Sequence, residues 1–324
     1  MANPLGAAII GTAHSHARGH LASLRKSKNW EFIAAAEPDP GLLAKAKAHP
    51  DWSGVKWMPV DELLANEKIE MVCIETDPLD ALTYSLRSVE AGKHTRIDKP
   101  PGINLHLLRK IYDEADRKHL NVQMGYVYRY NPAFRLAHRA ITENWLGPVR
   151  SVICQMNDMQ TAESRRRLDS YPGGQFYEIC CHLLDPLMWF LGEPKRVSAT
   201  LRHTEDFDDR AEDDVQATFE FDPAVAVIKS HTRDGKRYFY VFGENGSIQI
   251  DDPDRPKVRL ALTAPHGEFK AGIHNVDVGP SERYTPDLDD LAGAIRERRG
   301  VEFFTPQHDL AVQRVLLEAC GMTI

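Results

Sequence analysis

The sequence predicts an α/β protein with two parts: an N-terminal doubly wound parallel sheet, then an α+β domain with a large, mostly antiparallel open sheet. Three observations support this fold class. Short apolar runs alternate with amphipathic helical patterns in the first third of the chain. Later strand-like runs follow one another largely without helices between them. The 324 residues are also too many for one ordinary core. We therefore expect two domains, over residues 1–125 and 126–324.

The first domain is predicted from strands that are each followed by a helix. The strands are expected at Ala7–Ile10, Glu31–Ala36, Met71–Ile74, His94–Ile97 and Asn121–Gly125. The helices are expected at Ala17–Ser27, Leu42–Ala48, Leu79–Ala91 and Leu105–His119. This alternation indicates βαβ units with helices on both faces of a parallel sheet. The run Met71–Ile74 is apolar throughout, as in a central strand that is covered on both sides.

The second domain is predicted to begin with a helix at Ala133–Glu143, which the Gly147-Pro148 pair follows. Strands are expected at Val149–Gln155, Val197–Arg202, Val215–Phe221, Ala224–Ser230, Tyr238–Phe242, Ser247–Ile250 and Val258–Leu262. A helix at about Gln175–Leu191 interrupts them, and the chain returns to helix at Asp287–Arg298 and Gln307–Ala319. The segments Met156–Pro172 and Pro265–Arg283 are interpreted as loops, and Arg165 to Arg167 as a solvated part of the first.

Composition excludes several classes of protein. Hydrophobic residues make up 42% and charged residues 27%, which is ordinary for a globular chain and not for a disordered one. The net charge is −7 without a dominant block of one sign, so nucleic acid and anionic membrane are poor partners. No run approaches the roughly 18 apolar residues of a membrane helix. The five scattered cysteines indicate reduced thiols, and we expect a cytoplasmic protein.

The turn after the first strand carries a degenerate dinucleotide-binding pattern. Gly11 occupies the first glycine position, while Ala13 and His16 occupy the second and third. Glu37 ends the second strand, where a carboxylate can accept hydrogen bonds from the adenosine ribose and would repel a 2′-phosphate. NAD is therefore favoured over NADP. The expected cofactor-binding residues here are Gly11, Thr12, Ala13, His14, Ser15 and Glu37.

His14 and His16 also suggest a metal, because imidazole is a common zinc ligand. Residues two apart on a helix point in different directions, however, and no cysteine or carboxylate lies beside them in the sequence. We therefore favour lining of the turn or simple packing for both, and predict no metal.

Lys99 follows the run His94–Ile97, within Asp98-Lys99-Pro100. This places it at the carboxyl end of a predicted strand, the edge at which open α/β sheets bind ligands. A lysine there can reach the nicotinamide region and polarise a substrate hydroxyl or carbonyl. The alternative interpretation is a solvated surface lysine before a turn.

A second group of ionisable residues lies on the predicted helix after Gly173-Gly174. Glu178, His182 and Asp185 are spaced by four and three, so on a helix they share one face. Their neighbours are mostly apolar, and three ionisable groups in such surroundings favour an acid–base site over a core histidine.

With these motifs the chain resembles the glucose–fructose oxidoreductase and inositol dehydrogenase family of sugar-type dehydrogenases. Asp98-Lys99-Pro100 matches the family's Glu-Lys-Pro, and the Gly-Gly…Glu178…His182…Asp185 helix matches its second motif, with Glu178 in place of Asp. Further matching segments are Ala91-Gly92-Lys93-His94, Tyr128-Arg129-Tyr130-Asn131-Pro132, Leu146-Gly147-Pro148-Val149 and Tyr284 with Asp287 to Leu291.

The resemblance implies an NAD-binding Rossmann domain over residues 1–125. It also implies a domain over residues 126–324 that binds substrate and forms a homo-dimer or homo-tetramer through its sheet. The implied roles are catalysis for Lys99, His182 and Glu178, substrate binding for Asp185, Arg129 and Tyr284, and cofactor binding for Thr76, Asp77 and Lys99. The expected reaction is oxidation of a secondary alcohol on a sugar, polyol or sugar derivative.

Two alternatives remain open at this point. The same residues could serve an enzyme that retains NAD and uses transient oxidation for elimination or epimerisation. Two turn glycines are also replaced, by Ala13 and His16, so the chain could instead be a non-catalytic ligand-binding protein on a dehydrogenase scaffold.

Overall fold

The computed structural model describes residues 3–323, which divide into two compact units. The first unit runs to Tyr126 and also contains Tyr284–Leu310. The second contains Val127–Arg283 and the residues from Ala311 on. The sequence predicts two continuous domains, whereas the compact units are discontinuous. Within the described residues, no helix is both long and apolar enough to cross a membrane.

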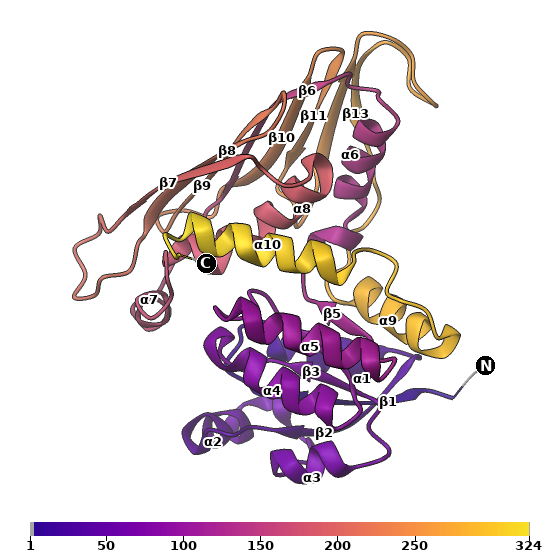
Figure 1. The fold of residues 1–324 in the computed structure, drawn as a ribbon, viewed down its shortest axis with the longest axis vertical. Coiled ribbons are helices and arrows are strands. Elements are labelled where there is room, and N and C mark those ends of the chain that lie inside the picture. Colours follow the sequence, from indigo (N-terminus) through magenta and orange to yellow (C-terminus); the bar gives the residue numbers. More distant parts are fainter. Residues whose placement is uncertain (1–2, 324) are drawn as a thin grey trace. The chain divides into compact units, whose positions relative to one another are not determined.

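The first unit has a five-stranded parallel sheet in the order β2-β1-β3-β4-β5. Its strands are β1 (Leu5–Ile10), β2 (Trp30–Ala36), β3 (Met71–Ile74), β4 (His94–Ile97) and β5 (Val122–Met124). Its helices are α1 (Ala17–Lys26), α2 (Pro40–Ala48), α3 (Val60–Ala65), α4 (Pro78–Glu90), α5 (Leu105–Arg117) and α9 (Thr285–Glu297). Figure 1 shows the strands and α1 to α5 of this unit in indigo and purple, and α9 in orange-yellow.

The two faces of this sheet are covered by different helices. The connection from β1 leads one way along the sheet, while the connections from β3 and β4 lead the other way. Because such crossovers are right-handed, α1 lies on one face and α4 and α5 lie on the other. The core on the α1 side joins apolar residues of α1, the first strands and α9: Ile9, Leu21, Leu24, Trp30, Leu288 and Leu291.

Helix α9 belongs to this unit because polar contacts tie it to the sheet. Asp287 Oδ2 accepts hydrogen bonds from Arg96 Nε at 3.0 Å and Nη2 at 2.7 Å. The Trp30 indole N–H donates to the carbonyl of Leu288 at 3.0 Å. Both partners are more than 190 positions away in the sequence, so no local pattern could indicate them.

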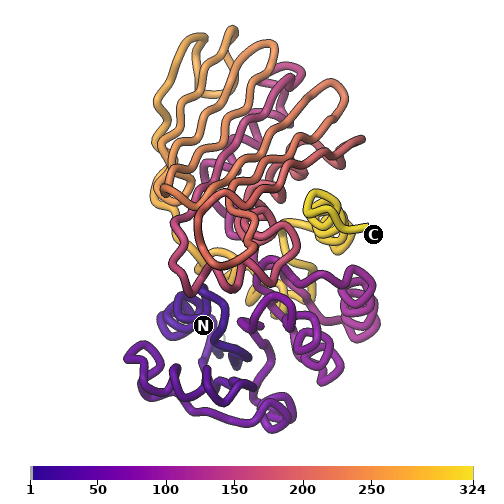
Figure 2. Tube along the Cα trace, turned by 90° about the vertical axis from the view of Figure 1, so that its left-hand side faces the viewer, coloured from indigo at the N-terminus to yellow at the C-terminus, as the bar shows by residue number. Residues whose placement is uncertain are grey.

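The second unit has an eight-stranded sheet in the order β13-β12-β11-β10-β6-β9-β8-β7, visible as one open sheet in Figure 2. Only β6 and β9 pair in parallel, so the predicted mostly antiparallel sheet is confirmed. The strands are β6 (Val149–Met156), β7 (Arg196–Arg202), β8 (Asp214–Glu220), β9 (Val225–His231), β10 (Arg237–Gly243), β11 (Gly246–Asp251), β12 (Lys257–Leu262) and β13 (Gly272–Val276). The helices are α6 (Pro132–Thr142), α7 (Ala162–Leu168), α8 (Cys181–Leu191) and, extending from the first unit, α10 (Pro306–Ala319).

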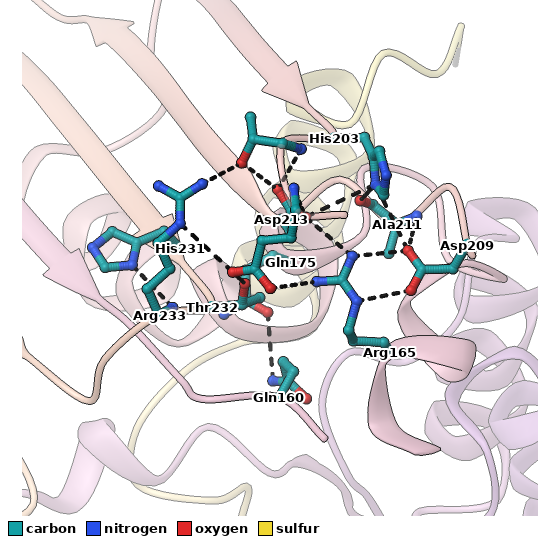
Figure 3. Close-up of polar contacts among 12 residues, drawn as sticks. Gln160, Arg165, Gln175, His203, Asp209, Ala211, Asp213, His231, Thr232 and Arg233 are labelled. Carbon is teal, nitrogen blue, oxygen red and sulfur yellow. Dashed lines mark hydrogen bonds and ion pairs between the residues drawn. The ribbon is translucent and has the colours of Figure 1, made fainter. Parts of the chain in front are cut away.

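Strand β13 and helix α7 lie in segments predicted as loops. Helix α7 has an N-terminal capping box between Thr161 and Ser164. Arg165, predicted to be solvated, has no exposed side-chain surface and pairs with Asp209, Asp213 and Glu205 (Figure 3). That prediction was wrong, because the three carboxylates are 40 to 48 positions away along the chain.

Candidate functional site

The glycine turn lies at the carboxyl ends of β1 and β3, where the chain connections diverge along the sheet. Such a switch point is the usual ligand site of an open α/β sheet. Gly11 has φ +95°, and a Cβ there would lie 2.4 Å from the backbone nitrogen of Thr76. Only glycine fits so close an approach, so the one intact position of the degenerate pattern is the sterically required one.

The turn and the end of β2 fit a dinucleotide. Helix α1 begins directly after the turn, so its N-terminal N–H groups are available to a pyrophosphate. Thr12 Oγ1 donates to Glu37 Oε2 at 2.7 Å, and the Asp39 N–H donates to Glu37 Oε1 at 2.9 Å. A carboxylate has about four acceptor sites, so half-buried Glu37 can still accept from ribose hydroxyls.

Thr76 and Asp77 follow β3 at the same edge. Thr76 is buried, and its hydroxyl donates to the carbonyl of Asp77 at 3.2 Å. The Asp77 side chain accepts from the Leu79 N–H at 3.0 Å and so caps α4. Both residues thus shape the loop beside Gly11.

His14 is buried rather than turned outward along the turn. The backbone N–H of His16 donates to His14 Nδ1 at 3.2 Å, which places the ring proton on Nε2. Nε2 in turn donates to the carbonyl of Lys99 at 3.0 Å. The ring therefore supports the end of β4. Ser15, its neighbour, is exposed.

Both the backbone carbonyl and the backbone N–H of Lys99 form hydrogen bonds with side chains. In addition to the bond from His14, the Lys99 N–H donates to Asp98 Oδ1 at 2.7 Å. The Lys99 side chain is almost fully buried, at 1% exposure for the residue. Lysine is almost never fully buried unless its charge is paired. The surface-lysine interpretation of Lys99 therefore does not describe this structure.

A second layer of buried ionisable side chains, formed by His20, Glu75 and Arg96, lies beside Asp98. Burial lowers the pKa of His20, helped by the Arg96 guanidinium, and burial beside Asp98 raises the pKa of Glu75. Burial would also raise the pKa of Asp98, but the imidazoles of His14 and His16 and the Arg96 guanidinium hold it well below its usual range. Asp98 is thus the ionised carboxylate of this group.

Tyr284 closes this layer from the start of α9. Its ring centroid lies 4.1 Å from that of His20 and 5.4 Å from that of His16. A Cβ on Gly19 would lie 2.5 Å from the Tyr284 ring, so α1 has room for the tyrosine only because residue 19 is glycine. The structure therefore places Tyr284 over histidines of the first unit.

In the second unit, the predicted helix Gln175–Leu191 is divided. A π-helix at Phe176–Cys180 leads into α8, so Glu178 and His182 lie on either side of a change in helical repeat. π-Turns are frequent at functional sites. His182 is buried at the start of α8, 5.7 Å from the Tyr128 ring between centroids. Pro186 has no N–H for the carbonyl of His182, four residues earlier, as α-helical bonding would require.

Asp185 and Arg129 bind each other. Arg129 Nη2 donates to Asp185 Oδ1 at 2.6 Å, and Nε lies 3.1 and 3.0 Å from the two carboxylate oxygens. Both side chains are almost completely buried. The two predicted substrate contacts therefore form one buried ion pair, between Arg129 and a residue of α8.

The sequence interpretation missed the layer formed by His20, Glu75 and Arg96. A signal for one of them was present: Glu75 follows the apolar strand Met71–Ile74 and occupies the edge where ligands bind. Lys99 belongs to the first unit and His182 to the second.

Two family descriptions match the chain. "Oxidoreductase family, NAD-binding Rossmann fold" matches residues 5–126, and "GFO/IDH/MocA C-terminal domain" matches residues 134–249. The chain is 24% identical over 296 residues to the oxidoreductase ORF334 of Rhizobium meliloti, covering 89% of this chain and 88% of that protein. It is 24% identical to levoglucosan dehydrogenase of Pseudarthrobacter phenanthrenivorans over 330 residues, with 88% and 81% covered.

Solved structures share the fold. A levoglucosan dehydrogenase in complex with NADH and levoglucosan superposes with a TM-score of 0.81 at 19% identity, covering 98% of this chain and 97% of the other. The UDP-N-acetylglucosamine 3-dehydrogenase of Acidithiobacillus ferrooxidans gives 0.79 at 19% identity, with 98% and 96% covered. At these identities the likeness establishes the fold alone.

Proposed function

The chain belongs to the GFO/IDH/MocA family of oxidoreductases, which has an NAD-binding Rossmann domain, and from this premise we propose its reaction. The protein catalyses NAD-dependent oxidation of a secondary alcohol on a sugar, polyol or sugar derivative. The observation that carries the proposal is Lys99, buried at the carboxyl end of β4 and fixed through its backbone by Asp98 and His14.

In this proposal Lys99 and His182 share the acid–base work. His182 accepts the proton of the substrate hydroxyl, and the Lys99 ammonium stabilises the negative charge that develops on that oxygen. NAD, held by the Gly11 turn and Glu37, would supply the hydride acceptor for this oxidation. Glu178 tunes His182 across the π-turn, and the Arg129–Asp185 pair fixes the start of α8 and the nearby substrate hydroxyls.

Glu37 supports NAD as the cofactor. Its carboxylate ends β2 and is already oriented by Thr12 and Asp39. A 2′-phosphate at the ribose would bring negative charge against this group, so we propose selectivity against NADP. The binding constants of the two cofactors, measured on the same preparation, test this directly.

Assembly and location complete the proposal. The outer face of the C-terminal sheet exposes apolar side chains, among them Ile153 and Val225, which supports a homo-dimer or homo-tetramer through this face. All five cysteines are buried thiols, which supports a cytoplasmic location. Light scattering of the purified chain gives the oligomer number.

The test is NADH formation, followed by absorbance, over a panel of sugars and polyols. With an active substrate, His182→Gln lowers kcat by about 10²- to 10⁴-fold, the usual contribution of a positioned base, and leaves NAD binding intact. The matched control is His138→Gln, another histidine of the same unit. The His138 ring stacks on Trp189, with 4.1 Å between the ring centroids, and has no part in the proposed reaction. For Lys99→Met the control is Lys110→Met on the exposed face of α5.

Three outcomes would contradict the proposal. Full turnover in His182→Gln would remove the base from the mechanism. Substrate conversion with retained NAD and no net NADH would indicate elimination or epimerisation instead. A chain that binds neither NAD nor NADH at millimolar concentration would be a ligand-binding protein on a dehydrogenase scaffold.

A further inference from the structure

Two histidine nitrogens and a carboxylate oxygen converge inside the first unit. His16 Nδ1 lies 3.1 Å from Asp98 Oδ2, and His14 Nδ1 lies 3.4 Å from the same oxygen. The three donor atoms all lie within 4.8 Å of one another. The sequence disfavoured a metal because no third ligand lay near the histidines, but the fold supplies one from 82 positions away.

The separations match those between ligands of one small cation. Zinc binds imidazole nitrogen and carboxylate oxygen at about 2.0–2.2 Å, so tetrahedral ligand atoms lie about 3.3–3.5 Å apart. The measured 3.1 and 3.4 Å are close to this spacing. Two histidines and one carboxylate, with a further position open, are also a recurrent donor set for divalent transition metals.

In His14 and Asp98, the polar atom that points away from the proposed site already has a hydrogen-bond partner. His14 Nε2 donates to the carbonyl of Lys99, and Asp98 Oδ1 accepts from the Lys99 N–H. Metal-binding histidines usually donate their second nitrogen to such a partner, and ligating carboxylates are similarly hydrogen-bonded. A metal would take the His14 Nδ1 lone pair in place of its 3.2 Å bond from the His16 N–H.

An independent observation points to a missing ligand. Both ring nitrogens of His20 are buried and, among residues 3–323, have no hydrogen-bond partner. His20 Nδ1 lies 2.7 Å from Glu75 Oε1. His20 Nδ1 is 3.6 Å from Asp98 Oδ2, and Glu75 Oε2 is 3.8 Å from His14 Nδ1. Buried polar groups without partners are rare and call for an explanation.

Buried carboxyl groups also outnumber the one guanidinium beside them. Glu75, Asp98 and Asp287 gather three buried carboxyl groups around one guanidinium, that of Arg96. Arg96 gives its hydrogen bonds to Asp287, whereas its Nη1 stays 3.7 Å from Glu75 and 3.8 Å from Asp98. Arg96 therefore approaches the same Asp98 oxygen, Oδ2, as His14 and His16, but gives it no hydrogen bond.

We propose that His14, His16 and Asp98 form a binding site for a divalent transition-metal ion of the Zn²⁺ type, with His20 and Glu75 beside it. The ion fixes the end of β4 through Asp98 and so holds the backbone of Lys99 in place. The site lies wholly within the first unit and does not depend on the proposed reaction.

The experiment titrates Zn²⁺ into the full-length chain after treatment with a chelator, with calorimetry as the readout. We expect one Zn²⁺ per chain, a higher unfolding temperature with Zn²⁺, and a visible absorption spectrum of protein-bound Co²⁺. His16→Gln should weaken Zn²⁺ binding by about 100-fold or more, beyond the 10–100-fold that loss of an outer-shell partner causes. His106→Gln, at an exposed position of α5, is the matched control and should bind like the parent chain.

His14→Gln is the second ligand variant, and circular dichroism of each metal-free variant verifies that it folds. Absence of Zn²⁺ binding to the parent chain would overturn the proposal. Binding that survives both His16→Gln and His14→Gln, or that His106→Gln weakens equally, would also overturn it. Because no NAD or sugar is present in the titration, failure here leaves the proposed dehydrogenase function untouched.

Discussion

Each unit buries an arginine that has no exposed side-chain surface, and the two are satisfied differently. Arg165 in the second unit donates to three carboxylates, and Asp213 among them also accepts from the backbone of Thr204 and Glu205 (Figure 3). Arg96 in the first unit donates to Asp287 alone, and its Nη1 has no hydrogen-bond partner among the described residues. A fully satisfied network holds a loop in place, whereas a partly satisfied one has capacity for a ligand.

The largest effect is expected from Arg165→Met. The change removes the cation from between Asp209 and Asp213 and should destabilise the second unit by about 3–5 kcal/mol, as for other broken buried ion pairs. Urea denaturation measures this. Arg166→Met, at the adjacent exposed position, is the control and should stay within about 0.5 kcal/mol of the parent chain. Equal stability of the two variants would mean that the Arg165 network is not structural.

A smaller effect is expected from Asp287→Asn in the first unit. The amide oxygen can still accept from Arg96, so the loss should be about 1.5–3 kcal/mol, the value of a hydrogen bond to a charged group. Amide hydrogen exchange of α9, whose Leu288 carbonyl accepts from the Trp30 indole, reports on this unit. Asp289→Asn, on the exposed side of α9, is the control. A loss as large as that of Arg165→Met would contradict the difference drawn between the two arginines.

The smallest expected effect is a dependence on pH. Burial alone would raise the pKa of Asp213, but hydrogen bonds from Thr204, the Glu205 N–H and Arg165 hold it below its ordinary value. Hydrogen bonding from Arg165 likewise lowers the pKa of Asp209.

The lowered pKa values of Asp213 and Asp209 determine how stability changes with pH. A carboxyl group whose folded pKa is depressed adds stability that is complete above its unfolded value, about 3.9, and is lost as the pH falls through the folded value. The stability difference between the parent chain and Arg165→Met should therefore be constant from neutral pH to about pH 5 and narrow below about pH 4. A difference that grows on acidification would show that the carboxylates are not ionised partners of Arg165.

The sequence predicted those elements whose signal is local. Met71–Ile74 and His94–Ile97 are strands with the predicted bounds, because continuous burial demands continuous apolar character in the first and a following turn ends the second. The prediction of Lys99 at the carboxyl end of β4 followed from the same strand. Alternating burial along β6 or β12 likewise comes from side chains that point alternately to the core.

What the sequence could not predict depends on partners far along the chain. Arg165 was interpreted as solvated because its carboxylates follow only after β7. No carboxylate lies beside His14 and His16 in the sequence, but the fold places Asp98 next to both. The spacing of apolar residues in Phe176–Cys180 does not distinguish a π-turn from an α-helix. In each case the pattern was correct over a few residues, and the missing information was three-dimensional.

The return of Tyr284–Leu310 to the first unit has a consequence for synthesis of the protein. Domains commonly fold in order as the ribosome releases them, amino-terminal first. Here Arg96 cannot bond to Asp287 until Asp287 has been synthesised. The Trp30 indole likewise cannot donate to the carbonyl of Leu288 before that residue is present. A nascent chain therefore holds its first unit incomplete, with part of its core uncovered, until α9 has been synthesised.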